Sequence, residues 1–318
     1  MVSNIVVSVF CLAYNHEKYI RGALEGFVSQ KTNFAFEVLV HDDASTDHTA
    51  EIILEYAEKY PHIIKPILQT ENQHSKGVRI LREFLLPQAK GKYFAWCEGD
   101  DYWIDDRKLQ MQVDFLEAHP NYSACYHRIR VNDIREGSVR YIPQMEHSRD
   151  FGIKEIVQGG AIFQLSAAMM RSELYRQMPV ATFAAKGFGD IQLYIYSAMC
   201  GKCYVFFDVM SQYNHGTAGS WTIRTANAGK DKKIEHEQCY KAMLERVNQY
   251  YDYQYDEAFS YAIKRLEFNI HALRSDRTAM RRPEYHDFYV RYKKQQNRLF
   301  FKKHFPWLVK LKKFLKKR

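Results

Sequence analysis

The fold of this chain is decided by the stretch GKYFAWCEGDD at residues 91–101. Its first part is a short apolar run typical of a buried strand, and three acids then crowd into the four positions 98–101. Mg²⁺ and Mn²⁺ take oxygen ligands and share their coordination with substrate phosphates, so one or two carboxylates suffice. The stretch therefore predicts a metal-assisted phosphate site. The other interpretation is an acidic loop that caps the next helix, where Asp105 and Asp106 stand in N-cap position.

Two more apolar runs, upstream of this stretch, also end in polar residues. Residues 5–12 lead into Ala13, Tyr14 and Asn15, and residues 37–40 lead into HDDASTD at 41–47. Each run is followed by a helical pattern, so we predict a mostly parallel α/β sheet. Such sheets bind ligands beyond the carboxyl ends of their strands, where all three polar clusters fall. We also expect Ser45 or Thr46 to cap a helix at residues 49–60.

The order and spacing of these motifs resemble the family 2 inverting glycosyltransferases of bacterial type. The matching segments are VSVF at 7–10, DDASTD at 42–47, the stretch 91–101 and Gly189-Asp190. The similarity extends over roughly residues 3 to 215. It implies the GT-A nucleotide-diphospho-sugar transferase fold, a mixed and mostly parallel α/β sheet flanked by helices, with a C-terminal helical extension. It also implies a nucleotide-sugar donor, a UDP-sugar above all, and Mn²⁺ or Mg²⁺ as cofactor.

The resemblance assigns the donor-binding roles. Tyr14 would stack on the base, and Asp43 would accept a hydrogen bond from the imide of uracil. Asp101 would be the direct metal ligand, with Asp100 near the ribose or the water shell of the metal, while Glu98 stands where the family more often has aspartate. The implied nucleotide-binding set is Ala13, Tyr14, Asn15, Asp43, Lys76, Arg79 and Asp100, and the implied metal set is Asp101, Asp100 and His215.

Asp190 follows Gly189 at the predicted start of an apolar helix that runs to about Cys200. The resemblance implies that Asp190 is the catalytic base, which takes the proton from the acceptor hydroxyl in a single inverting displacement. A carboxylate favoured by the helix dipole is the other interpretation. On the acceptor side we place Trp103, Gly189 and Trp221.

Composition excludes some other classes of protein. The 318 residues are 46% hydrophobic and 26% charged, as in a folded protein with a substantial core. The net charge of +9 is not accompanied by a motif that reads nucleic acid, so no such partner is expected. Two alternatives stay open: a non-catalytic sugar-nucleotide-binding protein, and a nucleotidyltransferase of related α/β fold. Six cysteines in this length predict neither a disulfide framework nor a zinc site.

We divide the chain into a catalytic domain (1–222), a helical extension (223–298) and a basic amphipathic tail (299–318). The extension would pack on the catalytic domain or on a second subunit, which leaves a homo-oligomer open. The tail alternates bulky apolar residues with lysines, a pattern typical of a helix that lies on an anionic membrane. The short apolar run at the N-terminus reads as a strand rather than a signal peptide. We therefore expect a cytoplasmic protein, peripheral on the inner face of the membrane, whose acceptor is a glycan or a lipid-linked glycan.

Overall fold

The computed structural model describes residues 4–159, 162–185, 188–217 and 221–304. They form two compact units. The first contains the residues up to Ala181 together with Phe188–Asn227, and the second contains the described residues of 182–187 and those from Ala228 onward. None of the helices in this described part has the length and hydropathy that a bilayer crossing requires. Most of the predicted basic tail, residues 305–318, lies outside the described residues.

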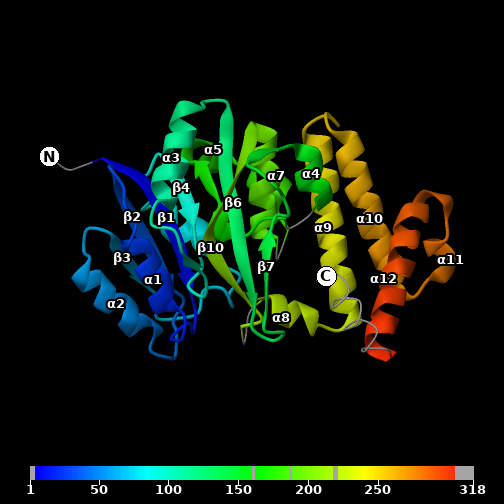
Figure 1. The fold of residues 1–318 in the computed structure, drawn as a ribbon, viewed down its shortest axis with the longest axis horizontal. Helices are drawn as coiled ribbons and strands as arrows, with labels where there is room; N and C mark the ends of the chain where they lie inside the picture. Colours follow the sequence, from blue (N-terminus) through cyan, green and yellow to red (C-terminus); the bar gives the residue numbers. More distant parts are fainter. Residues whose placement is uncertain (1–3, 160–161, 186–187, 218–220, 305–318) are drawn as a thin grey trace, which may run out of the picture. The chain divides into compact units, whose positions relative to one another are not determined.

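A mixed sheet forms the centre of the first unit (Figure 1). The strand order is β3-β2-β1-β4-β9-β6-β10-β5, with β7 paired to β6 and β8 paired to β10. The described strands are β1 (Ile5–Ala13), β2 (Ala35–Asp42), β3 (Ile64–Leu68), β4 (Tyr93–Trp96), β5 (Tyr102–Trp103), β6 (Tyr122–Asp133), β7 (Ser138–Ile142), β8 (Arg149–Phe151), β9 (Met169–Arg171) and β10 (Lys202–His215). The helices of this part are α1 (Ile20–Val28), α2 (Thr49–Lys59), η1 (Leu81–Leu85), α3 (Lys108–Ala118), α4 (Ile153–Gly159), η2 (Leu165–Ala167), α5 (Ser172–Gln177), α6 (Val180–Phe183), α7 (Gly189–Cys200) and α8 (Trp221–Ala226).

The sheet is mostly parallel, as predicted. β1 pairs in parallel with β2 and β4, β2 with β3, and β6 with β10. The short strand β9 is antiparallel to both β4 and β6, so these two longer strands run in the same direction. The carboxyl ends of β1, β2, β4, β6 and β10 therefore lie along one edge of the sheet, which is where a ligand site is expected.

The core of the first unit is built on β1. Val7, Val9 and Cys11 alternate along one face of the strand and are fully buried, as are Ile20 and Leu24 of α1. Helices α1 and α2 lie side by side against this part of the sheet (Figure 1). Burial of each large apolar side chain stabilises the fold by about 1.5–3 kcal/mol, so this core holds the strand ends in fixed positions.

The predicted cap of α2 is wrong. The N-cap residue is His48, and its side chain makes no capping bond. The backbone N–H of Thr49 donates instead to Asp47 Oδ1 at 3.0 Å. Ser45 does not cap α2, because its hydroxyl accepts from the N–H of Asn15 at 2.9 Å and donates to Asp42, to which its own N–H also donates at 2.9 Å. Side-chain competition within the loop thus overrode the usual preference of serine for the cap.

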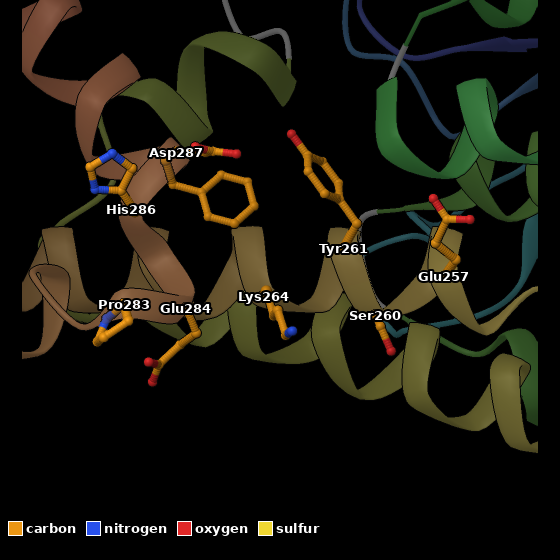
Figure 2. A pocket seen from close by; sticks show the side chains of 9 residues that line it. Glu257, Ser260, Tyr261, Lys264, Pro283, Glu284, His286 and Asp287 are labelled. Carbon is orange, nitrogen blue, oxygen red and sulfur yellow. The ribbon is translucent and has the colours of Figure 1, made fainter.

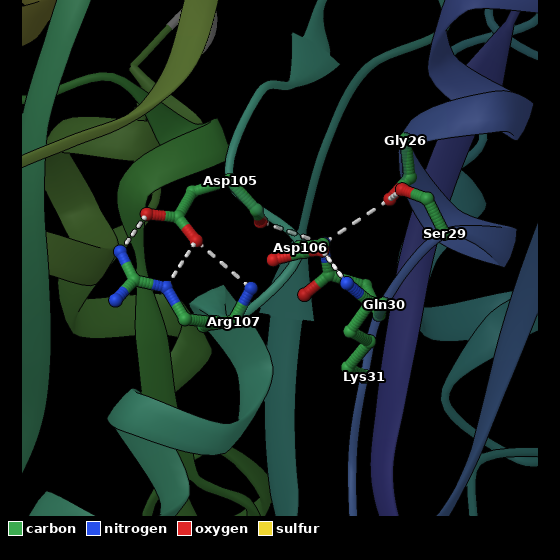
Figure 3. Close-up of polar contacts among 7 residues, drawn as sticks. All are labelled: Gly26, Ser29, Gln30, Lys31, Asp105, Asp106 and Arg107. Carbon is green, nitrogen blue, oxygen red and sulfur yellow. Dashed lines mark hydrogen bonds and ion pairs between the residues drawn. The ribbon is translucent and has the colours of Figure 1, made fainter.

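The segment after the acidic stretch is tied to α1 by Gln30 (Figure 3). The Gln30 amide donates to the carbonyls of Gly26 (3.2 Å) and Asp105 (2.9 Å), and its oxygen accepts from the N–H of Leu109 at 3.0 Å. The Asp105 carboxylate accepts from the N–H and guanidinium of Arg107, which is the N-cap residue of α3 and makes no side-chain cap. The acids at 105 and 106 therefore shape a turn rather than cap the helix.

The second unit is helical. It contains α9 (Lys230–Tyr250), α10 (Asp256–Arg274), α11 (Arg277–Met280), η3 (Pro283–Tyr285) and α12 (His286–His304). Helices α9 and α10 lie in the region predicted to be a helical extension. Phe268, Met280, Tyr285 and Phe288 form a buried cluster. A depression of about 390 Å³ is lined by residues of α10, η3 and α12. Figure 2 shows the side chains that line it. The rings of Tyr261 and Phe288, both in this lining, are 5.1 Å apart. The residues that line this depression include both acids and Lys264. The carboxyl edge of the sheet differs, because the cluster there consists of acids.

We predict that Gly91→Ala lowers the free energy of unfolding by about 1–3 kcal/mol, the usual cost of overpacking. A Cβ at Gly91 would lie 2.3 Å from the backbone nitrogen of Ser8 and 2.7 Å from the carbonyl carbon of Val7, so β1 would have to shift. The matched control is Gly152→Ala, because a Cβ there meets nothing within 4 Å. Urea unfolding measures both variants. Equal stabilities of the two would show that β1 tolerates the extra atom.

Candidate active site

The loops that follow β1 and β2 are joined by hydrogen bonds. The N–H of Asn15 donates to Ser45 Oγ at 2.9 Å, and the N–H of Thr46 donates to Asn15 Oδ1 at 2.8 Å. Asn15 adopts a left-handed conformation with φ of 55°, which asparagine tolerates better than most residues. Beside it, Tyr14 is 45% exposed, so its ring is accessible at the edge of the sheet. The two loops form one surface on which a flat ring could stack.

Asp43 is almost completely buried below this surface. Its carboxylate accepts from the N–H groups of Gln73 (2.8 Å) and His74 (3.0 Å), and its own N–H donates to the carbonyl of Ala13 at 3.0 Å. Asp43 therefore holds the loop at residues 72–75 against the sheet. Each carboxylate oxygen has a second lone pair, so this role is compatible with the predicted contact to a base, which stays a prediction.

Glu98, Asp100 and Asp101 follow the end of β4. Asp101 is 3% exposed, and burial, followed by the charges of Asp100 and Glu98, raises its pKa well above the usual range. The Glu98 side chain is exposed. Desolvation of its carboxylate, followed by the charges of Asp100 and Asp190, raises the pKa of Glu98 to about 8. The charged forms of Asp101 and Glu98 are thus destabilised.

The end of β10 holds these acids in place. The N–H of Asn214 donates to Asp101 Oδ1 at 3.3 Å, and its side-chain amide donates to the carbonyl of Asp100 at 3.0 Å. The hydroxyl of Thr217 donates to Asp100 Oδ2 at 3.3 Å. His215 lies between them in sequence, and its Nδ1 is 2.9 Å from Asp133 Oδ2 at the end of β6. The loop after β4 is therefore fixed by β10.

Asp190 lies in the first turn of α7, so the predicted helix start is confirmed. Its Oδ1 accepts from the N–H of Ile191 at 2.8 Å, which satisfies the free N–H of a helix start. Burial raises the pKa of the Asp190 carboxyl. Desolvation raises the pKa of Glu98 and that of Tyr194, and the charge of Asp190 adds to both shifts. Asp190 therefore acts electrostatically on the group of acids after β4.

The structure places other predicted residues away from this group. Trp103 is 4% exposed, its ring packs against Phe27 and below Lys108, and its N–H donates to the carbonyl of Ser166 at 3.2 Å. The indole of Trp103 therefore lies in the core of this structure, and its contact with an acceptor stays a prediction.

Lys76 forms an ion pair with Glu71 on the surface, while Arg79 is exposed. These contacts do not test whether Lys76 or Arg79 binds a diphosphate, so that role stays a prediction for both residues. Gly189 is exposed at the start of α7, and a Cβ there meets nothing within 4 Å. Trp221 begins α8, and its side chain lies outside what the structure describes.

Two residues that sequence reasoning passed over belong to the same edge of the sheet. Asn214 stands next to His215 in the sequence but received no role, because its function depends on the antiparallel pairing of β10 with β5. His16 lies against Gly99, where a Cβ would approach its Nδ1 to 2.8 Å. Glycine at position 99 thus allows the acidic loop to approach the end of β1. The local sequence pattern does not predict this requirement.

A divalent cation fits the chemistry of the acidic group. In the described part of the chain no group of three or more His, Cys, Asp or Glu side chains has the arrangement of a complete metal site. Burial and nearby carboxylates nevertheless raise the pKa of Asp101 and of Glu98, and a cation among these acids would remove the repulsion between them. Mg²⁺ and Mn²⁺ need only one or two carboxylates when phosphate oxygens complete the shell. The donor set therefore fits a metal that arrives with a diphosphate.

Residues 8–178 match the family model of glycosyl transferase family 2. The chain belongs to this family. The resemblance seen in the sequence is thus confirmed, and so is the mixed, mostly parallel α/β fold that it implied.

Curated relatives are bacterial. An uncharacterized protein of Mycobacterium tuberculosis strain H37Rv is 35% identical over 215 residues, which is 68% of this chain and 60% of that protein. The putative glycosyltransferase EpsE of Bacillus subtilis is 33% identical over 178 residues, 56% of this chain and 60% of EpsE. WfaP of Escherichia coli, a UDP-Glc:α-D-GlcNAc-diphosphoundecaprenol β-1,3-glucosyltransferase, is 34% identical over 38% of this chain and 46% of its own. The chain thus spans less than two thirds of the length of these relatives.

Solved structures share the fold. S. aureus TarS in complex with UDP superimposes with a TM-score of 0.57 at 17% identity, covering 92% of each chain. The mannosyltransferase PcManGT of Pyrobaculum calidifontis, in complex with GDP-Man and Mn²⁺, gives a TM-score of 0.54 at 17% identity over 91% of this chain and 84% of its own. At these identities the likeness concerns the arrangement of helices and strands alone.

We predict that Asp101→Asn stabilises the metal-free protein. Because folding raises the pKa of Asp101 and of Glu98, the folded state binds more protons than the unfolded state above about pH 4, and stability falls as the pH rises toward 8. Asp101→Asn removes one of the two carboxyl groups that cause this fall in stability. It should melt at a higher temperature than the wild type at about pH 8 in chelator, with a smaller difference near pH 4.

Added Mn²⁺ with UDP should reverse the order, because only the wild type gains stability from binding. Asp114→Asn on exposed α3 surface serves as control and should behave like the wild type at each pH. Thermal melting monitored by circular dichroism measures all three. A lower melting temperature of Asp101→Asn in chelator would exclude charge repulsion at this position.

Proposed function

We propose that this protein is a metal-dependent inverting glycosyltransferase, which moves a sugar of hexosyl type from a nucleotide sugar to a glycan or lipid-linked acceptor. The observation that carries the proposal is the pair of hydrogen bonds from Asn214 that fixes Asp100 and Asp101 at the carboxyl edge of the sheet. These two acids form the candidate site of the leaving diphosphate. A UDP-sugar donor is supported by the UDP that TarS binds and by the UDP-Glc in the name of WfaP.

Each group has a defined task in the proposed mechanism. Tyr14 stacks on the base and Asp43 accepts its imide hydrogen bond, with Ala13 and Asn15 shaping the same loop. Asp101 and Asp100 would hold Mn²⁺ or Mg²⁺, which offsets the negative charge of the leaving diphosphate. Asp190 takes the proton from the acceptor hydroxyl while the oxygen attacks the anomeric carbon. Burial raises the pKa of Asp190, which makes its carboxylate a stronger base.

The alternatives have a direct test. A glycosyltransferase incubated with a UDP-sugar and Mn²⁺ hydrolyses it slowly and releases UDP. A nucleotidyltransferase should instead release pyrophosphate from a nucleoside triphosphate and a sugar phosphate. A non-catalytic binding protein should bind the UDP-sugar and release neither product. Chromatography of the three reaction mixtures separates these functions.

We predict that Asp190→Asn lowers sugar transfer by about 100-fold or more, because an amide keeps the shape of the side chain but accepts no proton. The affinity for UDP with Mn²⁺ should not change, since the base acts only when the acceptor attacks. Asp43→Asn should show the opposite pattern, with weaker UDP binding as its main defect. Transfer assays and calorimetry together measure both. Transfer at the wild-type rate by Asp190→Asn would place the base elsewhere.

The domain assignment and the membrane contact are part of the same proposal. Residues 1–222 would carry catalysis, residues 223–298 would form a helical extension that leaves room for a homo-oligomer, and residues 299–318 would lie on the inner face of the cell membrane. The lysine-rich composition of the tail supports this localisation, since each basic residue near an anionic surface contributes about 1 kcal/mol. An acceptor linked to lipid would then be reached without release of the enzyme.

Removal of the residues after Phe301 should leave the sheet unit folded and weaken binding to anionic vesicles. Added salt should have the same effect on the full chain, because screening shortens the reach of the lysines. Vesicle sedimentation measures binding, and circular dichroism checks the fold. Failure of the full chain to sediment with anionic vesicles at low salt would refute the membrane contact.

A further inference from the structure

The turn between β6 and β7 is fixed to the end of β10. Asp133 Oδ1 accepts from the N–H groups of Arg135 (3.1 Å) and Glu136 (2.9 Å), while its Oδ2 lies 2.9 Å from His215 Nδ1. The N–H of Ile134 donates to the carbonyl of His215 at 3.0 Å. One carboxylate thus shapes the turn and attaches it to β10. The position of Arg135 is set by the same bonds.

The side chain of Arg135 runs across Gly216. A Cβ at Gly216 would lie 3.2 Å from Cγ, 3.5 Å from Cδ and 3.8 Å from Nε of Arg135. Gly216 has a φ of 95°, a conformation that side chains rarely adopt, so this crossing requires glycine. The next residue, Thr217, donates to Asp100 Oδ2. The stem of Arg135 therefore lies one residue from the segment that holds the acidic loop.

The charge of Arg135 is not neutralised within the described part of the chain, where no carboxylate forms an ion pair with its guanidinium. Lys76 differs, because Glu71 pairs with its ammonium group. Arg135 is exposed, so an anion in solution can reach it. A guanidinium is a planar fork of N–H donors, which matches the oxygens of a phosphate better than an ammonium group does.

We propose that Arg135 binds a diphosphate at the carboxyl edge of the sheet. The inference rests on the proposed function, in which a diphosphate lies beside Asp100 and Asp101. Two sources share this chemistry: the diphosphate of the donor nucleotide, and the diphosphate of a lipid-linked acceptor. The turn after β6 then supplies a positive charge that the acidic loop lacks, and Gly216 provides the space for it.

Arg135→Gln tests the proposal, with calorimetry in Mn²⁺ and two probes. UDP stands for the donor and geranyl diphosphate, which has no base, stands for the lipid-linked acceptor. We expect the variant to lose about tenfold to a hundredfold in affinity for one or both probes, the effect of one charge-assisted hydrogen bond or two. Loss for UDP alone assigns the donor diphosphate, and loss for geranyl diphosphate alone assigns the acceptor. Uridine should bind the variant and the wild type equally.

Arg140→Gln is the matched control, because Arg140 is exposed on β7 of the same hairpin. It should bind both probes as the wild type does, and Arg135→Lys should recover part of the affinity. Unchanged affinity of Arg135→Gln for both probes overturns the inference and leaves the proposed function standing. If the wild type binds neither probe, both are wrong. If the wild type binds geranyl diphosphate but not UDP, the proposed UDP-sugar donor is wrong. The affinity of Arg135→Gln for geranyl diphosphate then still decides the role of Arg135.

Discussion

The candidate active site depends on one attachment, the pair of hydrogen bonds from Asn214 to the loop after β4. The loop leaves the sheet at Trp96, carries its acids beyond the strand ends, and returns as β5, which is antiparallel to β10. Asn214 binds both Asp100 and Asp101 at this return. The last strand of the sheet thus determines the geometry of residues that precede it by more than a hundred positions.

This arrangement sets stability against function. Glu98, Asp101 and Asp190 all have raised pKa values, so each of them is costly to keep charged in the folded protein. The buried core around β1 supplies the stability that tolerates this cost. A cation with a diphosphate would remove part of the repulsion, so the binding of such a ligand would offset part of this cost.

Much of the first unit could be predicted from local patterns. The apolar runs of β1, β2 and β4 and the start of α7 at Asp190 follow from hydrophobicity and glycine position alone. The cap of α2 could not, because Asp42 competes for Ser45 through bonds that the sequence does not display. The burial of Trp103 could not be predicted either, because an aromatic residue after an acidic loop has the same local pattern whether it faces a ligand or the core. Asn214 and Arg135 needed the pairing of β10 with β5 and β6, which is non-local.

The bonds between Asn15, Ser45 and Thr46 have an evolutionary consequence. They fix the two loops on the side of the base before any ligand arrives, so binding there requires little ordering. The turn after β6, in contrast, is attached through Asp133 and Ile134, and residues 135–137 form no part of the sheet. Substitutions in that turn therefore leave the loops after β1 and β2 intact. In a lineage of such proteins, the hairpin tip could change by drift while those two loops are inherited unchanged.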